Sequence, residues 1–208
     1  MGGPLDGNGE KSMEPTSPGS GRLSSIDPLQ AQIRDCFGRV AYSHKAHEKC
    51  ADIYQRRLAR VKFWQITLSA LTTGGLLAVL FGPASGQTLA AIASALLSTS
   101  LLILNAYTKD VDPGRLSERH RETAAALWDV RESYLSLLTD LRSGDITVDA
   151  ARERRDAIQA TLADAYRSAP RTTDRAYQLA QDGLQQREEL TFTDAEIDRL
   201  LPPSLRLG

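Results

Sequence analysis

Residues 63–108 form the longest stretch of this chain without a charged side chain or a histidine, although 25% of all residues are Asp, Glu, Lys or Arg. The segment 82–86 divides the stretch and reads Gly-Pro-Ala-Ser-Gly. Each half, 63–82 and 87–107, has about twenty residues, enough for a helix that crosses the apolar core of a bilayer. The pattern predicts a transmembrane hairpin over 63–108.

An alternative is a hairpin buried inside a soluble helical bundle, because Ala, Ser, Thr and Gly are abundant in both halves. Uncharged runs of this length are nevertheless uncommon in soluble cores. A signal peptide is not expected, since the first segment begins about sixty residues into the chain.

Basic residues lie on the same side of both predicted spans, and the turn between the spans is uncharged. Those before the first span and after the second are Arg56, Arg57, Arg60, Lys62, Lys109 and Arg115. Because positive residues stay on the cytoplasmic side, we expect a multi-pass protein of the cytoplasmic membrane with both termini cytoplasmic. The cytoplasmic boundary of the membrane, where amphipathic rings are favoured, is also the level of Phe63, Trp64 and Tyr107.

Residues 1–25 are rich in Gly, Pro and Ser and are expected to be a disordered tail. Asp27-Pro28 is typical of a helix start, and residues 26–62 are predicted to form a long helix that continues into the membrane. Its apolar stripe has coiled-coil spacing. The candidate oligomer seam consists of Ile33, Phe37, Val40, His44, His47 and Tyr54.

Residues 113–201 are predicted to form a cytoplasmic helical region. Helices are expected over about 114–142 after the Asp112 cap, from Thr147 to the residues before Pro170, and over about 173–190. Thr193-x-x-Glu196 is a capping box before a last short helix. The predicted fold class is therefore all-α, with a two-helix transmembrane hairpin and a cytoplasmic helical bundle.

The composition and motifs of the chain do not favour an enzyme. A net charge of −1 gives no basic excess for nucleic acid, and no phosphate-binding glycine loop or nucleophile elbow occurs. We therefore predict no catalytic residue, no cofactor and no nucleic-acid partner. Cys36 and Cys50 are expected to be reduced thiols on the cytoplasmic side.

His44-x-x-His47-x-x-Cys50 invites comparison with a metal site. On one helix these three side chains spread over about 120°, which is too wide for a compact site without ligands from elsewhere. We therefore predict packed histidines and no metal. A seam whose association depends on pH is a second hypothesis, because histidine titrates near neutrality.

A polar stripe follows one face of the second predicted span. Its candidate pore-lining residues are Gln87, Ser94, Ser98, Leu101 and Asn105. Two interpretations remain open at this point: close helix packing inside the hairpin, or one wall of a water-filled pore. A pore requires a homo-oligomer, because two helices cannot enclose water.

Three segments carry a family resemblance: Tyr54-Gln55-Arg56-Arg57 before the hairpin, the helix from Trp128 to Leu141, and Ala169-Pro170-x-Thr172 followed by Tyr177-x-x-Ala180. With the architecture of residues 30–190, they make the chain similar to the SLATT domain. That domain is the two-transmembrane effector associated with SMODS nucleotidyltransferases and SLOG sensors in bacterial conflict systems.

The resemblance implies a non-enzymatic effector of a nucleotide-signalling-type antiphage system that oligomerises and forms a pore or perturbs the cytoplasmic membrane. Its implied partners are membrane lipid, further copies of itself, and a cytoplasmic sensor or nucleotidyltransferase-system protein. A passive membrane-anchored scaffold that recruits a cytoplasmic partner is the alternative from another functional class. A soluble helical protein is the third possibility.

Overall fold

The computed structural model describes residues 20–202 and 206, and all regular secondary structure within them is helical. The helices are α1 (Ser20–Phe81), α2 (Ala84–Asp110), α3 (Pro113–Ser143), α4 (Val148–Arg167), α5 (Asp174–Gln185) and α6 (Asp194–Leu200). The all-α fold class is confirmed, and two of these helices are long and apolar enough to cross a membrane.

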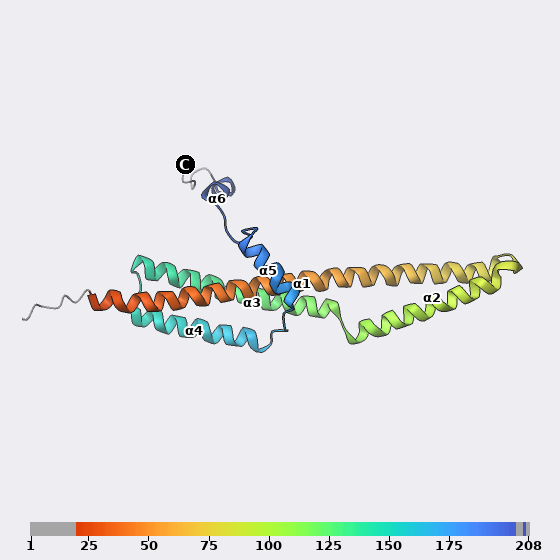
Figure 1. Ribbon diagram of the computed structural model, residues 1–208, viewed down its shortest axis with the longest axis horizontal. Coiled ribbons are helices and arrows are strands. Elements are labelled where there is room, and N and C mark those ends of the chain that lie inside the picture. Colours follow the sequence, from red (N-terminus) through yellow and green to blue (C-terminus); the bar gives the residue numbers. More distant parts are fainter. Residues whose placement is uncertain (1–19, 203–205, 207–208) are drawn as a thin grey trace, which may run out of the picture.

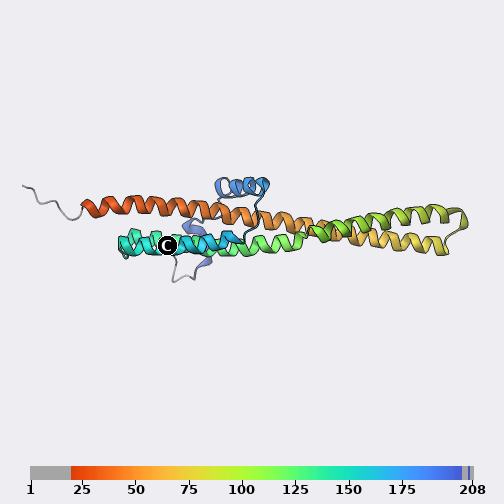
Figure 2. The same cartoon turned by 90° about the horizontal axis from the view of Figure 1, so that it is seen from below.

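Helix α1 runs the whole length of the molecule; α2, α3, α4 and α5 are arranged along it, whereas α6 stands away from it (Figure 1). Helices α3 and α4 lie along its N-terminal part, while α2 returns along its C-terminal part as a separate two-helix projection. Figure 2 shows α5 on the side of α1 that faces away from α3 and α4. One continuous helix therefore joins the bundle to the hairpin.

The start of α1 differs from the sequence prediction. The helix begins at Ser20 and contains Pro28 in its interior, so residues 20–25 belong to α1 and not to a disordered tail. The rest of that predicted tail, residues 1–19, lies outside the described residues. Extending an existing helix is far less costly than nucleating one, which lets α1 continue past the missing N–H of Pro28.

The core of the bundle is the contact between α1 and α3. Its fully buried side chains include Ile33 and Val40 of α1 and Leu127, Tyr134 and Leu137 of α3. Ala151 and Ile158 of α4 complete this hydrophobic cluster. The apolar stripe of α1 that sequence periodicity identified is thus covered by α3 of the same chain.

Local signals place most helix ends where the sequence predicts them. The Asp112 carboxylate accepts hydrogen bonds from the backbone N–H groups of Gly114 and Arg115 at 2.9 and 3.1 Å, which starts α3. Gly144 ends it with φ 78°, a conformation that glycine adopts at low cost. Thr147 caps α4, and Thr193 forms the predicted capping box with Glu196.

Helix α5 is shorter than predicted, because the chain leaves the helix after Gln185. Glu188 takes a positive φ of 51°, and the Glu189 N–H bonds back to the Gly183 carbonyl at 3.0 Å. The turn before α2 is also shorter than predicted: α2 begins at Ala84, directly after Gly82 and Pro83.

The hairpin exposes its apolar side chains. None of the described residues in 63–81 or in α2 is buried, and Leu80, Phe81 and Leu89 are 62%, 83% and 74% exposed. A soluble core would bury these groups, because removing apolar surface from water stabilises a fold by roughly 25 cal/mol per Å². The structure therefore contradicts the alternative of a hairpin buried inside a helical bundle.

Replacing Leu137 by Ala tests the α1–α3 core. Leu137 is fully buried, so the substitution is expected to lower the free energy of unfolding by about 2–5 kcal/mol through lost burial and a residual cavity. Leu135→Ala, at a position that is 46% exposed, is the control and should cost well under half as much. The measurement is thermal unfolding of the detergent-solubilised protein by circular dichroism, and equal losses would contradict this core.

Candidate membrane hairpin and its anchoring bundle

Glycine and proline together make the tight turn between α1 and α2. A Cβ atom on Gly82 would overlap the carbonyl oxygen of Ala78, so only glycine fits there. Pro83 is extended, with φ −65° and ψ 143°, and its carbonyl accepts a bond from the Gly86 N–H at 3.0 Å. The Gln87 side-chain amide donates to the Gly82 carbonyl at 3.2 Å. These contacts satisfy backbone groups where the chain reverses.

Five hydroxyl groups in the hairpin are bonded within their own helices. Thr67, Thr72, Thr73, Thr99 and Ser100 each donate to the carbonyl four residues earlier, at 2.8–3.0 Å. In lipid no water is available, so polar groups need such internal partners. These five hydroxyls therefore do not oppose insertion of the helices into an apolar environment.

The structure divides the predicted polar stripe of α2 into two parts. Asn105 accepts a hydrogen bond from the Gln65 amide of α1 at 2.8 Å, and the Ser94 hydroxyl lies against Gly75. Gln87 is occupied at the turn. Ser98 is exposed, and Leu101 is half-buried. The stripe thus serves helix contact at some positions and leaves others on the surface of the hairpin.

Ser94 and Gly75 form the closest approach of the two helices. A Cβ on Gly75 would overlap the Ser94 hydroxyl, whereas one on the neighbouring Gly74 would meet nothing within 4 Å. The Ser94 oxygen is buried and has no hydrogen-bond partner among the described residues. Sequence reasoning missed this pairing, although small residues in both spans indicated close contact.

A groove of about 810 Å³ runs along the other side of the α1–α2 contact. Leu101 and Asn105 of α2 form one wall of this groove. The other wall belongs to α1 and consists of Gln65, Ile66, Ser69, Ala70, Thr73, Gly74 and Leu77. The groove combines small, polar and apolar side chains, a composition that suits close helix packing in membranes.

Aromatic and basic side chains meet at the bundle end of the hairpin. Arg57 of α1 hydrogen-bonds the Tyr107 hydroxyl of α2, and its guanidinium lies 5.5 Å from the centroid of that ring. Phe63 and Trp64 pack edge to face at 5.6 Å and are 61% and 54% exposed. Such residues are enriched where a membrane meets water.

Two histidines of the predicted seam are buried against α3, and one of them contacts a third histidine. The Nδ1 atoms of His47 and His120 are 3.0 Å apart, and the Tyr54 ring stacks on His120 at 5.5 Å. Burial lowers the pKa of His44, of His120 and of His47, the last to about 4. The three imidazoles are therefore neutral at pH 7.

The rest of the predicted seam also contacts α3 of the same chain. Ile33 and Val40 are fully buried, while Phe37 and Tyr54 are half-buried. These contacts occupy the seam inside one chain, and an oligomer formed through it would have to displace α3.

Cys50 is a free buried thiol whose sulfur lies 4.0 Å from the Thr173 hydroxyl. Among the described residues, no three His, Cys, Asp or Glu side chains are grouped to hold a metal.

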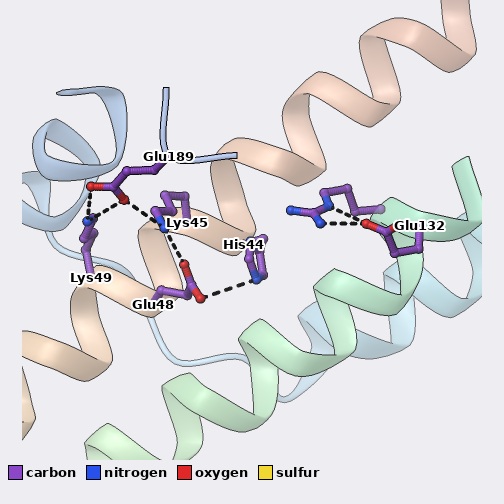
Figure 3. Close-up of polar contacts among 7 residues, drawn as sticks. His44, Lys45, Glu48, Lys49, Glu132 and Glu189 are labelled. Atoms are coloured by element: carbon purple, nitrogen blue, oxygen red, sulfur yellow. Dashed lines mark hydrogen bonds and ion pairs between the residues drawn. The ribbon is translucent and has the colours of Figure 1, made fainter. Parts of the chain in front are cut away.

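Glu189 fastens the C-terminal segment to α1. Its carboxylate lies 2.9 Å from the ammonium groups of both Lys45 and Lys49 (Figure 3). Lys45 also pairs with Glu48 at 2.8 Å. These lysines lower the pKa of Glu189 to about 2, and Lys49 has the larger effect.

A Cβ on Gly183 would meet the Glu189 carboxylate at 2.9 Å, so glycine leaves room for the contact. We call this cluster, Lys45, Lys49 and Glu189, the Glu189 clamp.

Comparison with known families shows which family the chain matches. The model for family 4 of the SMODS and SLOG-associating two-transmembrane effector domains covers residues 29–196. The matched region contains the bundle, the hairpin and the Glu189 clamp. No curated protein and no solved structure matches the chain.

The buried imidazoles predict that the bundle loses stability in acid. A histidine whose folded pKa is below its unfolded value of 6.5 destabilises the fold as pH falls from 6.5 toward the folded pKa, here about 4 for His47. At pH 5 this histidine alone costs on the order of 2 kcal/mol relative to pH 7.5. His47→Gln should reduce the drop in melting temperature between pH 7.5 and pH 5.

Tyr54→Phe is the control for this titration, because it keeps the ring on His120 and leaves all three histidines in place. It should retain the wild-type dependence on pH. An unchanged dependence in His47→Gln would show that this imidazole does not titrate as its burial requires.

Glu189→Gln tests the clamp. Removing the carboxylate charge should release α5 from α1 and speed amide exchange over residues 174–185 at pH 7, while α3 stays protected. Glu188→Gln is the matched control, since Glu188 has no ion pair among the described residues. The wild-type clamp should itself weaken as pH falls from 4.5 toward 2, when Glu189 is protonated. Equal exchange in both variants would rule out the clamp.

Proposed function

Because the chain belongs to the SMODS and SLOG-associating two-transmembrane (SLATT) effector family, a family of antiphage conflict systems, we propose that it makes the membrane leaky on activation. The observation that carries the proposal is the hairpin itself. It projects from the bundle, exposes large apolar side chains and bonds its hydroxyls internally. Such a surface is stable in lipid and unfavourable in water.

Both α1 and α2 cross the cytoplasmic membrane in this proposal, with the bundle and both termini in the cytoplasm. Support comes from the basic residues at the bundle end of the hairpin and from Phe63, Trp64 and Tyr107 at the same level. The turn at Gly82-Pro83 has no charged residue that would keep it on the cytoplasmic side of the membrane. The protein is therefore a multi-pass membrane protein anchored by a single hairpin.

A leak requires several copies of the hairpin, because two helices do not enclose a water path. The α1 helix offers small residues around Gly74, where a Cβ atom would meet nothing within 4 Å, and a helix of another copy packs closely against them and leaves the α2 wall of the groove open. Ser98, Leu101 and Asn105 line the water path after assembly, whereas Gln87 and Ser94 keep the two helices of one copy together. Uncharged polar walls suit a weakly selective path for ions.

The bundle has no enzymatic role in this proposal, in keeping with a family that is not known for catalysis. It holds the copies in register and receives the activating signal. A cytoplasmic sensor or nucleotidyltransferase-system protein of the same conflict system is the proposed partner. Ion dissipation through the assembled hairpins then arrests the infected cell.

The test is leakage of an encapsulated dye from liposomes that contain the purified protein at high density, at which the hairpins assemble without the activating partner. The wild type should release dye, and Ser98→Leu/Asn105→Leu should reduce the initial rate at least tenfold at equal incorporation, because it makes the proposed wall apolar. Leu102→Ala is the control: it changes a side chain that is 68% exposed on the hairpin, and it should keep the wild-type rate.

Full leakage by the double variant would show that the stripe does not line the path. Absence of leakage from the wild type, with normal insertion, would favour a passive membrane scaffold that recruits a cytoplasmic partner through the bundle.

A further inference from the structure

A cavity in the bundle lies between three elements that are far apart in the sequence. It has a volume of about 960 Å³ and is lined by α1, by the end of α4 with the loop that follows, and by α5. Its lining residues include Arg34, Gly38, Tyr42, Tyr166, Arg171 and Tyr177. Small-molecule sites span about 300–1,000 Å³, so this cavity has room for a ligand at the large end of that range.

The cavity carries uncompensated positive charge. Arg34 of α1 and Arg171 of the loop have no ion-pair partner among the described residues. The carboxylate in the lining, Asp35, is already paired with Arg39 at 2.9 Å. Guanidinium groups bind phosphate through two parallel hydrogen bonds and retain their charge at every physiological pH. The chemistry of the lining therefore favours a phosphorylated ligand.

Aromatic rings complete the lining, and hydrogen bonds hold two of them in place. Tyr42 and Tyr177 stack with ring centroids 6.3 Å apart and an interplanar angle of 28°. The Tyr42 hydroxyl accepts a bond from the Gln185 amide at 2.8 Å, and the Tyr166 hydroxyl bonds to Ser43 at 2.6 Å. Tyr177 is 52% exposed, which leaves part of its ring open to a planar group.

Gly38 lines the cavity on the side of α1. A Cβ atom at this position would meet nothing within 4 Å, so the missing side chain leaves open space. Glycine inside a helix costs about 1 kcal/mol relative to alanine. No neighbouring atom requires a glycine here, so a large side chain at this position would enter the cavity.

We propose that this cavity is a nucleotide-binding site, in which Arg34 and Arg171 hold the phosphates and the Tyr42–Tyr177 pair stacks on the base. A bound nucleotide bridges α1 to α5 and adds to the hold of the Glu189 clamp. Because α1 continues into the hairpin, occupancy of the site changes the leak; this last step rests on the proposed function, whereas binding does not.

The experiment is calorimetric titration of the full-length protein in detergent with ATP, GTP, cyclic di-AMP and cyclic di-GMP. At least one should bind saturably. Affinity should fall at least tenfold in Arg34→Gln/Arg171→Gln, which removes both free charges, and in Gly38→Trp, which fills the cavity. Gly38→Ala keeps the space, and Arg152→Gln changes an arginine at the other end of α4; both should bind like the wild type.

Inorganic pyrophosphate and a polyglutamate peptide are titrated alongside. The site is refuted if no nucleotide binds, if both cavity variants bind as tightly as the wild type, if pyrophosphate binds as well as the best nucleotide, or if only the peptide binds. Liposome leakage separates the two proposals. Nucleotide binding without leakage supports the nucleotide site and contradicts the pore. Leakage without nucleotide binding supports the pore and contradicts the nucleotide site.

Discussion

Backbone and hydroxyl groups inside a bilayer have no water to bind, and this constraint governs the hairpin of α1 and α2. The helices bond their own backbone, the threonine hydroxyls bond to carbonyls one turn earlier, and the exposed surface is left to leucine, isoleucine and phenylalanine. The Ser94 hydroxyl, at its close approach to Gly75, is buried between the two helices. All other described elements are consequently confined to the bundle end of α1, where charged residues are found.

A single helix carries the connection between these two environments. Residues of α1 contribute to the buried core with Ile33 and Val40, to the histidine contact with His47, to the Glu189 clamp, and then to the hairpin. Helical segments transmit displacement because their backbone is hydrogen-bonded throughout. No flexible linker separates the part of α1 that packs against α3 and α5 from the part that forms the hairpin.

Local chemistry was readable from the sequence, and contacts between distant residues were not. Asp112, Gly144, Thr147 and Thr193 mark helix ends through bonds to neighbouring residues, so their roles follow from spacing alone. The periodic stripe on α1 was visible too, yet periodicity does not say whether α3 of the same chain or another copy covers it. Glu189 and its two lysines are more than a hundred residues apart in the chain, and only the unexpected turn after Gln185 brings them together.

The polar links between the two spans lie near one end of the hairpin. Arg57 bonds to Tyr107 and Gln65 to Asn105, both close to the bundle, whereas the distal half is joined by the Gly82-Pro83 turn and by contacts of small and apolar groups. Sliding one span past the other along its axis would break both hydrogen bonds at once. Between these bonds and the turn, the spans are held by dispersion forces, which lipid tails replace. The hairpin is thus fixed at both ends, by hydrogen bonds near the bundle and by the covalent turn, and its middle has the greater freedom to rearrange.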